Sequence, residues 1–511
     1  MFKIILPLLI FCLIGWFLFT FKITDVPPGI NGDESIVGYN AALIAKTGVD
    51  SNGKFLPIFT RLPESYDWKQ PVTVYSTVLT FKLFGISYFN LRAASVLLVL
   101  LSGVIIFFLV KELYGGKWAI LSTIIFGTIP IVTIQSHLAL ENIAPVPFIS
   151  FWLWMMARYT KSNKTKYLIF SAIPLGISIY SYLGLRLIMP VLTFLSIGYI
   201  YYLSNLQKGK RFNLFPIILF VVSIIPFIVF LFIIRSEYPA AVFASNRPQN
   251  AMSYQQFFLP FLSSFDLSFL FIKGDLTPYH STGKQGMFLL ATLPLFLLGL
   301  FKMAKERTPF QIFVLLAFFL TPLLYGLPGS VHRASRLLTL LPMFTVITVL
   351  GFRSLFEIKR KIISIVLGLL ILTLIFINYK DFVLDYWFDY PNRVNQDFEK
   401  PIHQVFEKAY KFSKQDNLNL YIQEDIPGRN PPAYLFFENA YSPSGFMRWK
   451  AEQVLPSKSI VIVSSSVYDK LSKDEMFYPE EIEVLDHGSL DLILLINRSD
   501  REVQLQKRKY I

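Results

Sequence analysis

The chain has 511 residues, of which 54% are hydrophobic and only 16% charged, and it contains 50 phenylalanines. So few polar residues cannot cover soluble domains of this total size, which means that most of the chain must face lipid. The net charge of +14 is distributed in short clusters between apolar segments, whereas a nucleic-acid-binding protein gathers its basic residues on a polar domain.

Eleven apolar segments have about the length of a membrane-spanning helix, although some are short for a span. They lie at 4–21, 91–113, 118–136, 143–157, 167–183, 187–203, 215–234, 287–301, 310–326, 337–352 and 362–379. The first follows Lys3 and precedes no small-residue cleavage site, so we expect it to be retained. We therefore predict a membrane all-α domain over residues 1–380, with about 11 transmembrane helices.

Basic residues occur in every second connection between these segments, as is typical of cytoplasmic loops. These connections contain Lys111 and Lys117; Arg158, Lys161, Lys164 and Lys166; Lys208, Lys210 and Arg211; Lys302, Lys305 and Arg307; and Arg353, Lys359, Arg360 and Lys361. The pattern predicts a multi-pass protein of the cell membrane with a cytoplasmic N-terminus. An odd number of spans then makes the C-terminal domain extracytoplasmic.

The first long outer loop, 22–90, is too long for a simple turn, and such loops usually carry function. Apolar spacing predicts one helix over 34–46, followed by Gly48 as a stop signal. A second apolar piece, 72–84, ends at Gly85. We expect both helices to lie along the outer surface of the membrane.

The second long outer loop, 235–285, is rich in aromatic residues, Ser and Pro, and it contains Asp266, Asp275 and His280. A loop of this kind could cover a site. It is therefore the second place where we expect functional residues.

The composition becomes polar over 381–511. Strand-like runs at 418–422, 459–464 and 490–496, together with a helical pattern at 402–412, predict a small extracytoplasmic α/β domain. This segment contains no Gly-rich phosphate loop, metal cluster or nucleophile elbow.

Three carboxylates on the outer side are candidate catalytic groups. Asp33 and Glu34 begin the predicted surface helix, where they could simply cap its positive end. A carboxylate at the membrane rim could instead act as a general base toward an acceptor hydroxyl, and both roles can hold together. Glu141 lies at the exit of the third span, where a carboxylate is usually just solvated.

Outer cations are candidate ligands of a lipid phosphate. Lys69 precedes the second surface helix, where it either places its ammonium among lipid headgroups or holds the phosphate of a bound lipid. Arg186 lies close to Tyr180 and Tyr182, which are typical of an interfacial aromatic belt. A short outer loop holds the remaining cations, which are His332, Arg333 and Arg336. Such a cluster of cations favours the binding of an anion.

The order of these motifs resembles the protein O-mannosyltransferase and aminoarabinose transferase superfamily, which belongs to the GT-C class of membrane glycosyltransferases. The matching features run to about residue 350, and they are specific in their order rather than singly. They are the outer Asp33-Glu34 with Tyr39, Lys69-Gln70-Pro71, Phe84-Gly85, Leu91-Arg92, Tyr180-Ser181-Tyr182 with Arg186 and Pro190, Gly274-Asp275 with His280, and His332-Arg333 before Leu341-Pro342. Gln70 departs from the pattern, because many members have Pro there.

The resemblance implies a GT-C fold and an inverting transfer of a sugar from polyprenyl phosphate to an acceptor hydroxyl on the outer face. It implies that Asp33 is the base, that Lys69 contacts the carrier phosphate and that Glu141 helps to position the acceptor or the base, with Glu34 as a further candidate base. Arg186, Arg333 and Arg336 are the expected additional phosphate ligands. The expected substrate-binding residues are Tyr39, Tyr180, Tyr182, Asp275, His280 and His332.

The expected partners are a polyprenyl-phosphate-linked sugar, membrane lipids and an acceptor that is a protein, a glycolipid or a polysaccharide. We expect no cofactor and no nucleic acid; the single cysteine, Cys12, excludes a thiolate metal site, while a divalent metal stays open. A transporter or lipid flippase fits the span count equally well, but such proteins usually carry charged or broken segments at midspan in repeated halves. A membrane anchor for a binding domain leaves the long outer loops unexplained.

Overall fold

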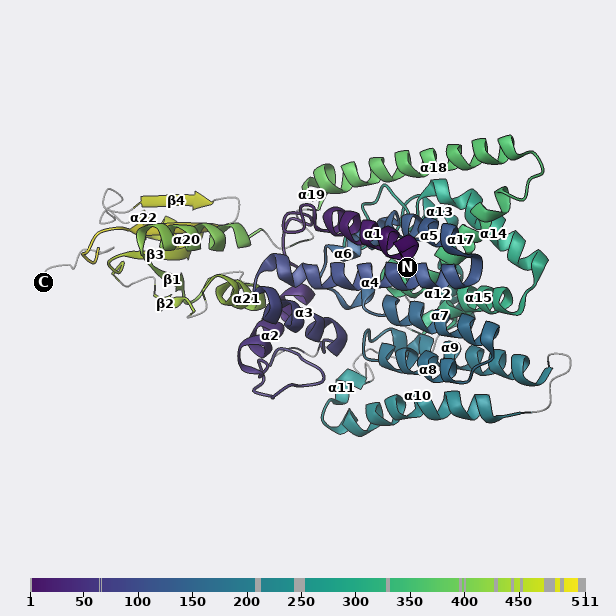
Figure 1. Cartoon of the computed structure of the whole chain (residues 1–511). Coiled ribbons are helices and arrows are strands. Elements are labelled where there is room, and N and C mark those ends of the chain that lie inside the picture. Colours follow the sequence, from purple (N-terminus) through teal and green to yellow (C-terminus); the bar gives the residue numbers. More distant parts are fainter. Residues whose placement is uncertain are drawn as a thin grey trace, which may run out of the picture.

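The computed structural model consists of a helical bundle with a small α/β domain at one end (Figure 1). The structure describes residues 2–63, 65, 67–206, 213–242, 253–327, 331–394, 398, 401–426, 431–442, 445–450, 454–472, 483–487 and 491–503. The basic residues Lys208, Lys210 and Arg211, and residues 243–252 of the second outer loop, lie outside the described residues.

The bundle contains a helix, or a bent pair of helices, at each of the eleven predicted spans. These are α1 (Phe2–Thr20), α4 (Tyr88–Tyr114), α5 (Gly116–Gly127) with α6 (Pro130–Ser136), α7 (Val146–Ser162), α8 (Lys166–Ser178), α9 (Leu185–Tyr201), α10 (Phe215–Ile233), α14 (Leu293–Glu306), α15 (Pro309–Leu320), α17 (Leu341–Leu355) and α18 (Lys361–Leu384). By length and composition alone, five described helical segments can cross a membrane, or six if the pair α5 and α6, bent by 64°, counts as one span. Others are shorter, such as α7 with 17 residues and α14 with 14.

Shorter helices connect the bundle elements. They are α2 (Gly32–Thr47), α3 (Pro71–Phe84), η1 (Glu141–Ile143), η2 (Tyr202–Leu206), η3 (Ile234–Ser236), α11 (Pro239–Val242), α12 (Tyr254–Ser263), α13 (Leu267–Phe271), η4 (Leu290–Thr292), η5 (Thr321–Gly326), α16 (Ala334–Leu337), η6 (Leu338–Leu340), η7 (Asp385–Asp389) and α19 (Tyr390–Arg393). Both predicted surface helices are present as α2 and α3, with Gly48 and Gly85 as their C-caps. Gly48 has a φ of 78°, a left-handed conformation that glycine adopts without steric cost.

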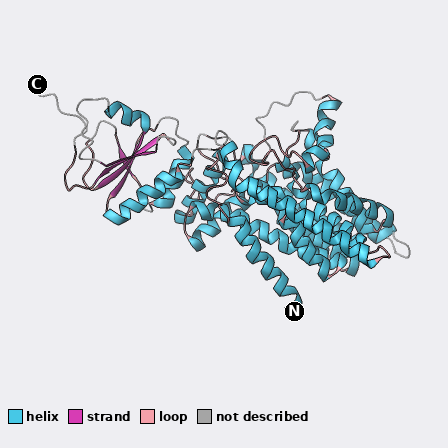
Figure 2. Cartoon of the chain, turned by 90° about the horizontal axis from the view of Figure 1, so that it is seen from above, coloured by secondary structure: helices cyan, strands magenta, loops and turns pink. Residues whose placement is uncertain are grey.

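The C-terminal domain holds all the described strands of the sheet (Figure 2). They are β1 (Asn419–Gln423), β2 (Met447–Trp449), β3 (Ser459–Ser464), β4 (Glu483–His487) and β5 (Leu492–Asn497), in the order β2-β1-β3-β5-β4. β1 pairs in parallel with β2 and β3, whereas β5 is antiparallel to β3 and β4. The helices of this domain are α20 (His403–Asp416), α21 (Pro431–Tyr441) and α22 (Ser465–Ser472).

The central strand β3 is buried on both faces, and its side chains alternate between two cores. Ile460 and Ile462 face a core that also contains residues of α2 and α3, while Val461 and Val463 face a separate core around Trp449. The sheet therefore packs toward the bundle through one face.

The expected domain boundary at residue 380 falls inside α18, which continues to Leu384 and is followed by η7 and α19 up to Arg393. α2, α3 and α19 lie at the end of the bundle that carries the C-terminal domain, and the basic connections α14–α15 and α17–α18 lie at the far end (Figure 1). These two basic connections and the helices of the first outer loop, α2 and α3, are thus at opposite ends of the bundle.

Candidate active site

Lys69 lies between two carboxylates in a group that we call the Lys69 cluster, consisting of Asp33, Asp67 and Lys69. Its Nζ atom is 2.6 Å from Oδ1 of Asp33 and 2.6 Å from Oδ2 of Asp67. The side chain of Lys69 is only 5% exposed, whereas those of Asp33 and Asp67 are 58% and 60% exposed. The ammonium is thus held inside while both carboxylates face outward.

The local backbone explains the position of Lys69. An antiparallel bridge between Thr60 and Lys69 closes the loop before α3, and Pro71 occupies the first helical turn. Proline suits that position because its fixed φ matches a helix start. Lys69 therefore leaves the loop in a fixed direction.

Electrostatics keep the cluster charged. Burial alone lowers the pKa of Lys69, but the charges of Asp33 and Asp67 outweigh burial and leave this pKa above its ordinary value. Burial alone raises the pKa of Asp33, but the charge and hydrogen bond of Lys69 leave it below its ordinary value. At neutral pH Asp33 is therefore a carboxylate able to accept a proton.

The N-cap of α2 is Asn31 and not Asp33. The Oδ1 atom of Asn31 accepts a hydrogen bond from the backbone N–H of Glu34 at 2.9 Å, and the Glu34 carboxylate accepts one from the N–H of Asn31 at 3.3 Å. This is a capping box, which satisfies two backbone donors at the helix start. Asn31 therefore takes the capping role that the sequence offered as one alternative for Asp33, and the Asp33 side chain is available to the Lys69 cluster.

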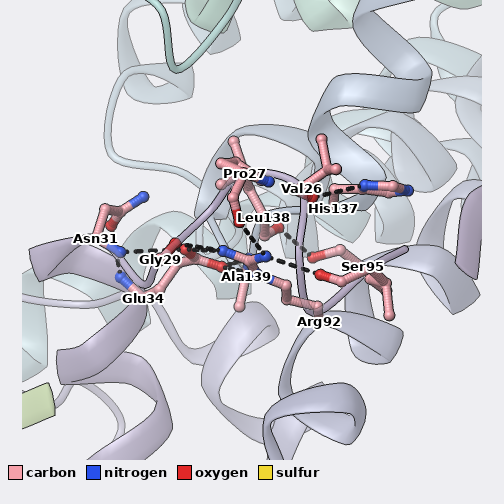
Figure 3. Close-up of polar contacts among 11 residues, drawn as sticks. Val26, Pro27, Gly29, Asn31, Glu34, Arg92, Ser95, His137, Leu138 and Ala139 are labelled. Atoms are coloured by element: carbon pink, nitrogen blue, oxygen red, sulfur yellow. Dashed lines mark hydrogen bonds and ion pairs between the residues drawn. The ribbon is translucent and has the colours of Figure 1, made fainter. Parts of the chain in front are cut away.

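Glu34 forms a fully buried ion pair with Arg92 (Figure 3). Nε and Nη2 of Arg92 donate to the two carboxylate oxygens at 3.0 and 3.1 Å, and the backbone N–H of Ala139 adds a bond of 2.8 Å. With the N–H of Asn31, the carboxylate accepts four hydrogen bonds. The prediction of Glu34 as a catalytic carboxylate does not fit this surrounding, because neither oxygen faces solvent or substrate.

Arg92 also binds the loop that leads from α1 to α2. Its guanidinium donates to the carbonyl oxygens of Ile23 at 2.7 Å, Pro27 at 3.2 Å and Gly29 at 2.8 Å. The adjacent His137 donates through Nδ1 to the carbonyl oxygen of Val26 at 2.8 Å (Figure 3). This buried network fixes the loop from which Asp33 emerges.

Gln70 connects Glu141 with Arg186. Its backbone N–H donates to Oε1 of Glu141, and its side-chain Oε1 accepts a bond of 2.8 Å from Nη2 of Arg186. Gln70 is the N-cap of α3 but makes no side-chain capping bond. Its side-chain amide accepts the bond from Arg186 instead of capping helix α3.

Burial raises the pKa of Glu141 to about 8, although Lys69 and the Gln70 N–H act in the opposite direction. Glu141 is therefore mostly protonated at neutral pH. The structure thus brings the ionised carboxylate of Asp33 and the protonated carboxyl of Glu141 into electrostatic contact with Lys69.

Several buried donors of this region have no hydrogen-bond partner among the described residues. They include Nε2 of Gln70, Nε of Arg186 and Nη1 of Arg336. Buried donors of this kind normally have a partner, so they indicate a place for water or an anion. Tyr182 lies within hydrogen-bonding reach of Arg336 and interacts electrostatically with Glu141.

The second outer loop is attached to the segment before α17. Asp275 is buried and accepts bonds of 2.8 Å from the N–H and the hydroxyl of Thr277, and one of 2.6 Å from the N–H of Ala334. Nε2 of His332 is 3.0 Å from Oδ2 of Asp266. Asp275 and His332 thus bind the second outer loop to the segment before α17.

His280 is the member of that loop that reaches toward the Lys69 cluster. Its Nδ1 atom is 2.9 Å from Nε2 of Gln135, and it interacts electrostatically with Asp33 and Arg333. Burial lowers its pKa to about 4, which keeps the imidazole neutral at physiological pH.

Two predicted aromatic residues have other partners. The hydroxyl of Tyr180 donates to the carbonyl of Phe227 at 2.6 Å, and its ring stacks near Phe59. Tyr39 interacts electrostatically with Glu438 and Arg448 of the C-terminal domain, so it belongs to the contact between the domains.

Sequence reasoning missed two members of the site. Asp67 lies two residues before Lys69 and could have been found from that spacing. Gln70 was noted only as a departure from a motif, whereas it links Glu141 with Arg186. The described residues contain no group of three or more His, Cys, Asp or Glu side chains that could hold a metal ion.

Comparisons with known proteins bear on the family and the fold of the chain. Residues 68–234 match the family model of dolichyl-phosphate-mannose-protein mannosyltransferase. No curated protein matches the chain by sequence.

Solved structures with a similar fold cover nearly the whole chain. ArnT from Cupriavidus metallidurans bound to undecaprenyl phosphate is 13% identical with a TM-score of 0.56, and its apo state is 12% identical with a TM-score of 0.55; both matches cover 99% of each chain. The oligosaccharyltransferase from Archaeoglobus fulgidus in the apo form is 11% identical with a TM-score of 0.50, covering 91% of this chain and 70% of that one. The predicted fold class is thus confirmed: the chain has the GT-C fold of membrane glycosyltransferases with a small C-terminal sheet domain, and about a third of it, residues 68–234, matches the mannosyltransferase family model.

Proposed function

We propose that this protein is a membrane glycosyltransferase that moves a sugar from a polyprenyl-phosphate donor to an acceptor hydroxyl on the outer face of the membrane. The observation that carries this proposal is the Lys69 cluster, in which a buried ammonium lies 2.6 Å from an exposed carboxylate. A lysine between two carboxylates at a membrane surface provides both a cation for a phosphate and a base for a hydroxyl.

The donor phosphate lies, in this proposal, against Lys69 and the unpartnered donors of Gln70, Arg186 and Arg336. Negative charge grows on the phosphate as the bond between the anomeric carbon and the phosphate oxygen breaks. Donors already fixed in a buried site stabilise that charge without further reorganisation. The neutral carboxyl of Glu141 adds no repulsion toward the phosphate.

Asp33 accepts the proton of the attacking hydroxyl. The acceptor oxygen forms a bond to the anomeric carbon on the side opposite the phosphate, the configuration inverts, and polyprenyl phosphate leaves with the bonding electrons. General-base help of this kind contributes roughly 10²- to 10⁴-fold in rate. Since fixed cations face a monophosphate leaving group, the chain's own residues supply every charge in this scheme.

The test uses the full chain in vesicles loaded with a polyprenyl phosphate that carries a radiolabelled sugar, together with an extract of cell-envelope acceptors. The wild type should convert the donor to free polyprenyl phosphate and label the acceptor, while Asp33→Asn should reduce this conversion by about a hundredfold or more. Donor that crosses the vesicle membrane without being cleaved would instead identify a lipid flippase.

A further inference from the structure

Helix α2 is shared between the candidate active site and the C-terminal domain. Asp33 lies in its first turn, and α21 of the C-terminal domain lies beside α2 (Figure 1). A helix is stiff over such a length, so a contact on one of its faces fixes the direction of side chains at its start.

One close contact between α2 and α21 is at Gly38. A Cβ atom at this position would lie 3.0 Å from Cδ2 of Phe436 and 3.0 Å from Cδ2 of Leu91. Phe436 is fully buried, and its ring stacks on Phe81 of α3 with centroids 6.2 Å apart. The glycine thus lets a ring of the C-terminal domain lie directly on the backbone of α2.

Two further contacts hold α21 in place. At the other end of α2, Nζ of Lys46 donates to Oδ1 of Asn439 at 2.8 Å. Near the start of α4, the rings of Tyr88 and Phe437 meet edge to face with centroids 5.5 Å apart. All these apolar residues belong to one core that continues to Ile460 and Ile462 of β3.

We propose that the C-terminal domain positions the base Asp33 through the packing of Phe436 on Gly38. This inference rests on the proposed role of Asp33. Phe436 is a positioning residue, because it touches α2 and not the substrate. Gly38 follows Asp33 by five residues, about 7.5 Å along the helix axis, so a displacement at the contact moves the carboxylate with it.

A size-exchange experiment in the full chain tests this. Gly38→Ala brings the new methyl to 3.0 Å from both the Phe436 ring and the Leu91 side chain, so these side chains or α2 must shift by a few tenths of an ångström. A displacement of about 1 Å at a reacting group can cost about a hundredfold in rate, so this smaller shift should cost about tenfold or less. We expect Gly38→Ala to lower kcat by about 3- to 10-fold at unchanged Kd for polyprenyl phosphate. Adding Phe436→Leu removes one of the two close contacts of the methyl and should restore part of kcat.

The matched control is Gly198→Ala in α9, where a Cβ would have nothing within 4 Å. Because alanine favours a helix over glycine, both single variants should fold, and only Gly38→Ala should lose activity. A Gly38→Ala protein with normal kcat, or a double variant that is no better than Gly38→Ala, overturns the positioning role.

The Asp33→Asn background separates this inference from the proposed function. If α2 acts through Asp33, Gly38→Ala should cause no further loss in the residual rate of Asp33→Asn. If the kcat loss of the double variant equals the product of the two single losses, Gly38 does not act through Asp33. This result overturns the positioning role and leaves the role of Asp33 as the base unaffected. Near-normal transfer by Asp33→Asn alone overturns the base itself.

Discussion

Lys69 and Asp33 are 36 positions apart in the chain, yet the ammonium of one lies 2.6 Å from the carboxylate of the other. The same ammonium is equally close to Asp67, whose side chain is exposed to nearly the same extent. The two carboxylates thus have similar contacts with Lys69 but start from different elements, one from α2 and one from the loop before α3.

A comparison of Asp33 with Asp67 tests most directly whether Asp33 is the catalytic base. Asp33→Asn should lower kcat by about a hundredfold or more, whereas Asp67→Asn should keep kcat within about tenfold of the wild type. Each variant removes one negative charge next to the Lys69 ammonium, so their effects on polyprenyl-phosphate binding should be similar. Equal losses of kcat in the two variants, measured under saturating donor, would contradict a special role for Asp33.

The buried pair of Glu34 and Arg92 should matter for folding. Glu34→Gln leaves the Arg92 guanidinium buried without a counter-charge, and breaking such a pair costs about 3–5 kcal/mol in the free energy of unfolding. Because both carboxylate oxygens of Glu34 accept bonds from Arg92, the structure makes Glu34→Gln a severe change. As a comparison, Glu237→Gln removes a partly exposed pair with Lys54 and should cost less than about 1 kcal/mol. Thermal unfolding in detergent measures both, and equal midpoints for the two variants would exclude the predicted difference.

Glu141 should make stability depend on pH. Burial raises its pKa to about 8 from an ordinary value of 4.5, so the folded protein binds this proton more tightly than the unfolded chain does. Its contribution to stability is fully present below about pH 4.5 and is lost as the pH rises through about 8. Glu141→Gln has no ionisable carboxyl at this position, so the variant lacks this dependence of stability on pH. The unfolding midpoint of the wild type should therefore fall relative to that of Glu141→Gln between pH 5 and pH 9, and a constant difference would show an unshifted carboxyl.

Arg186 should bind the donor phosphate through its planar guanidinium. Its Nη1 atom donates to the carbonyls of Ala241 and Val242 and its Nη2 to Gln70, while Nε has no partner among the described residues. Lysine cannot reproduce this set of bonds, so Arg186→Lys should weaken polyprenyl-phosphate binding by about tenfold or more. Arg158→Lys, at a surface pair with Glu112, serves as the control and should leave the Kd unchanged. Unchanged binding by Arg186→Lys would place the phosphate elsewhere.

The orientation of the chain can be tested by cysteine labelling, because Cys12 is the single cysteine. In a Cys12→Ser background, Lys414→Cys places a thiol on α20 and Lys305→Cys places one at the end of α14, both at exposed positions. An impermeant maleimide should label the first in intact cells and the second only after permeabilisation. The reverse result would turn the proposed active site toward the cytoplasm.

The sequence predicts the parts of this fold whose signal is local. The bounds predicted for β3, 459–464, agree with the structure because a continuous β-branched run between polar residues needs no partner to be recognised. α2 and α3 end at Gly48 and Gly85 as expected, since glycine stops a helix by its own conformation. By contrast, the short strand β2 and the polar strand β4 are stabilised by their neighbours and were not predicted.

The site is harder to predict because its contacts join distant segments. Nothing near Glu34 in the sequence shows that Arg92 binds it. Asp33 and Glu34 both carry a carboxyl group, so the sequence does not show that the Asp33 side chain is exposed whereas that of Glu34 is fully buried. The roles of Asp33, Lys69 and Glu141 in catalysis stay predictions. Their proximity, however, now has a physical basis in the bonds of Lys69 and Gln70.

The hydrogen bonds of Glu34 can form only in a fixed order while the chain is being synthesised. As the chain is made from the N-terminus, this carboxylate first meets its capping partner Asn31, then Arg92 once α4 exists, and last the N–H of Ala139. A chain arrested before residue 139 therefore lacks part of the network that fixes the first outer loop. The loop that carries Asp33 can reach its final form only after the third apolar segment has been synthesised.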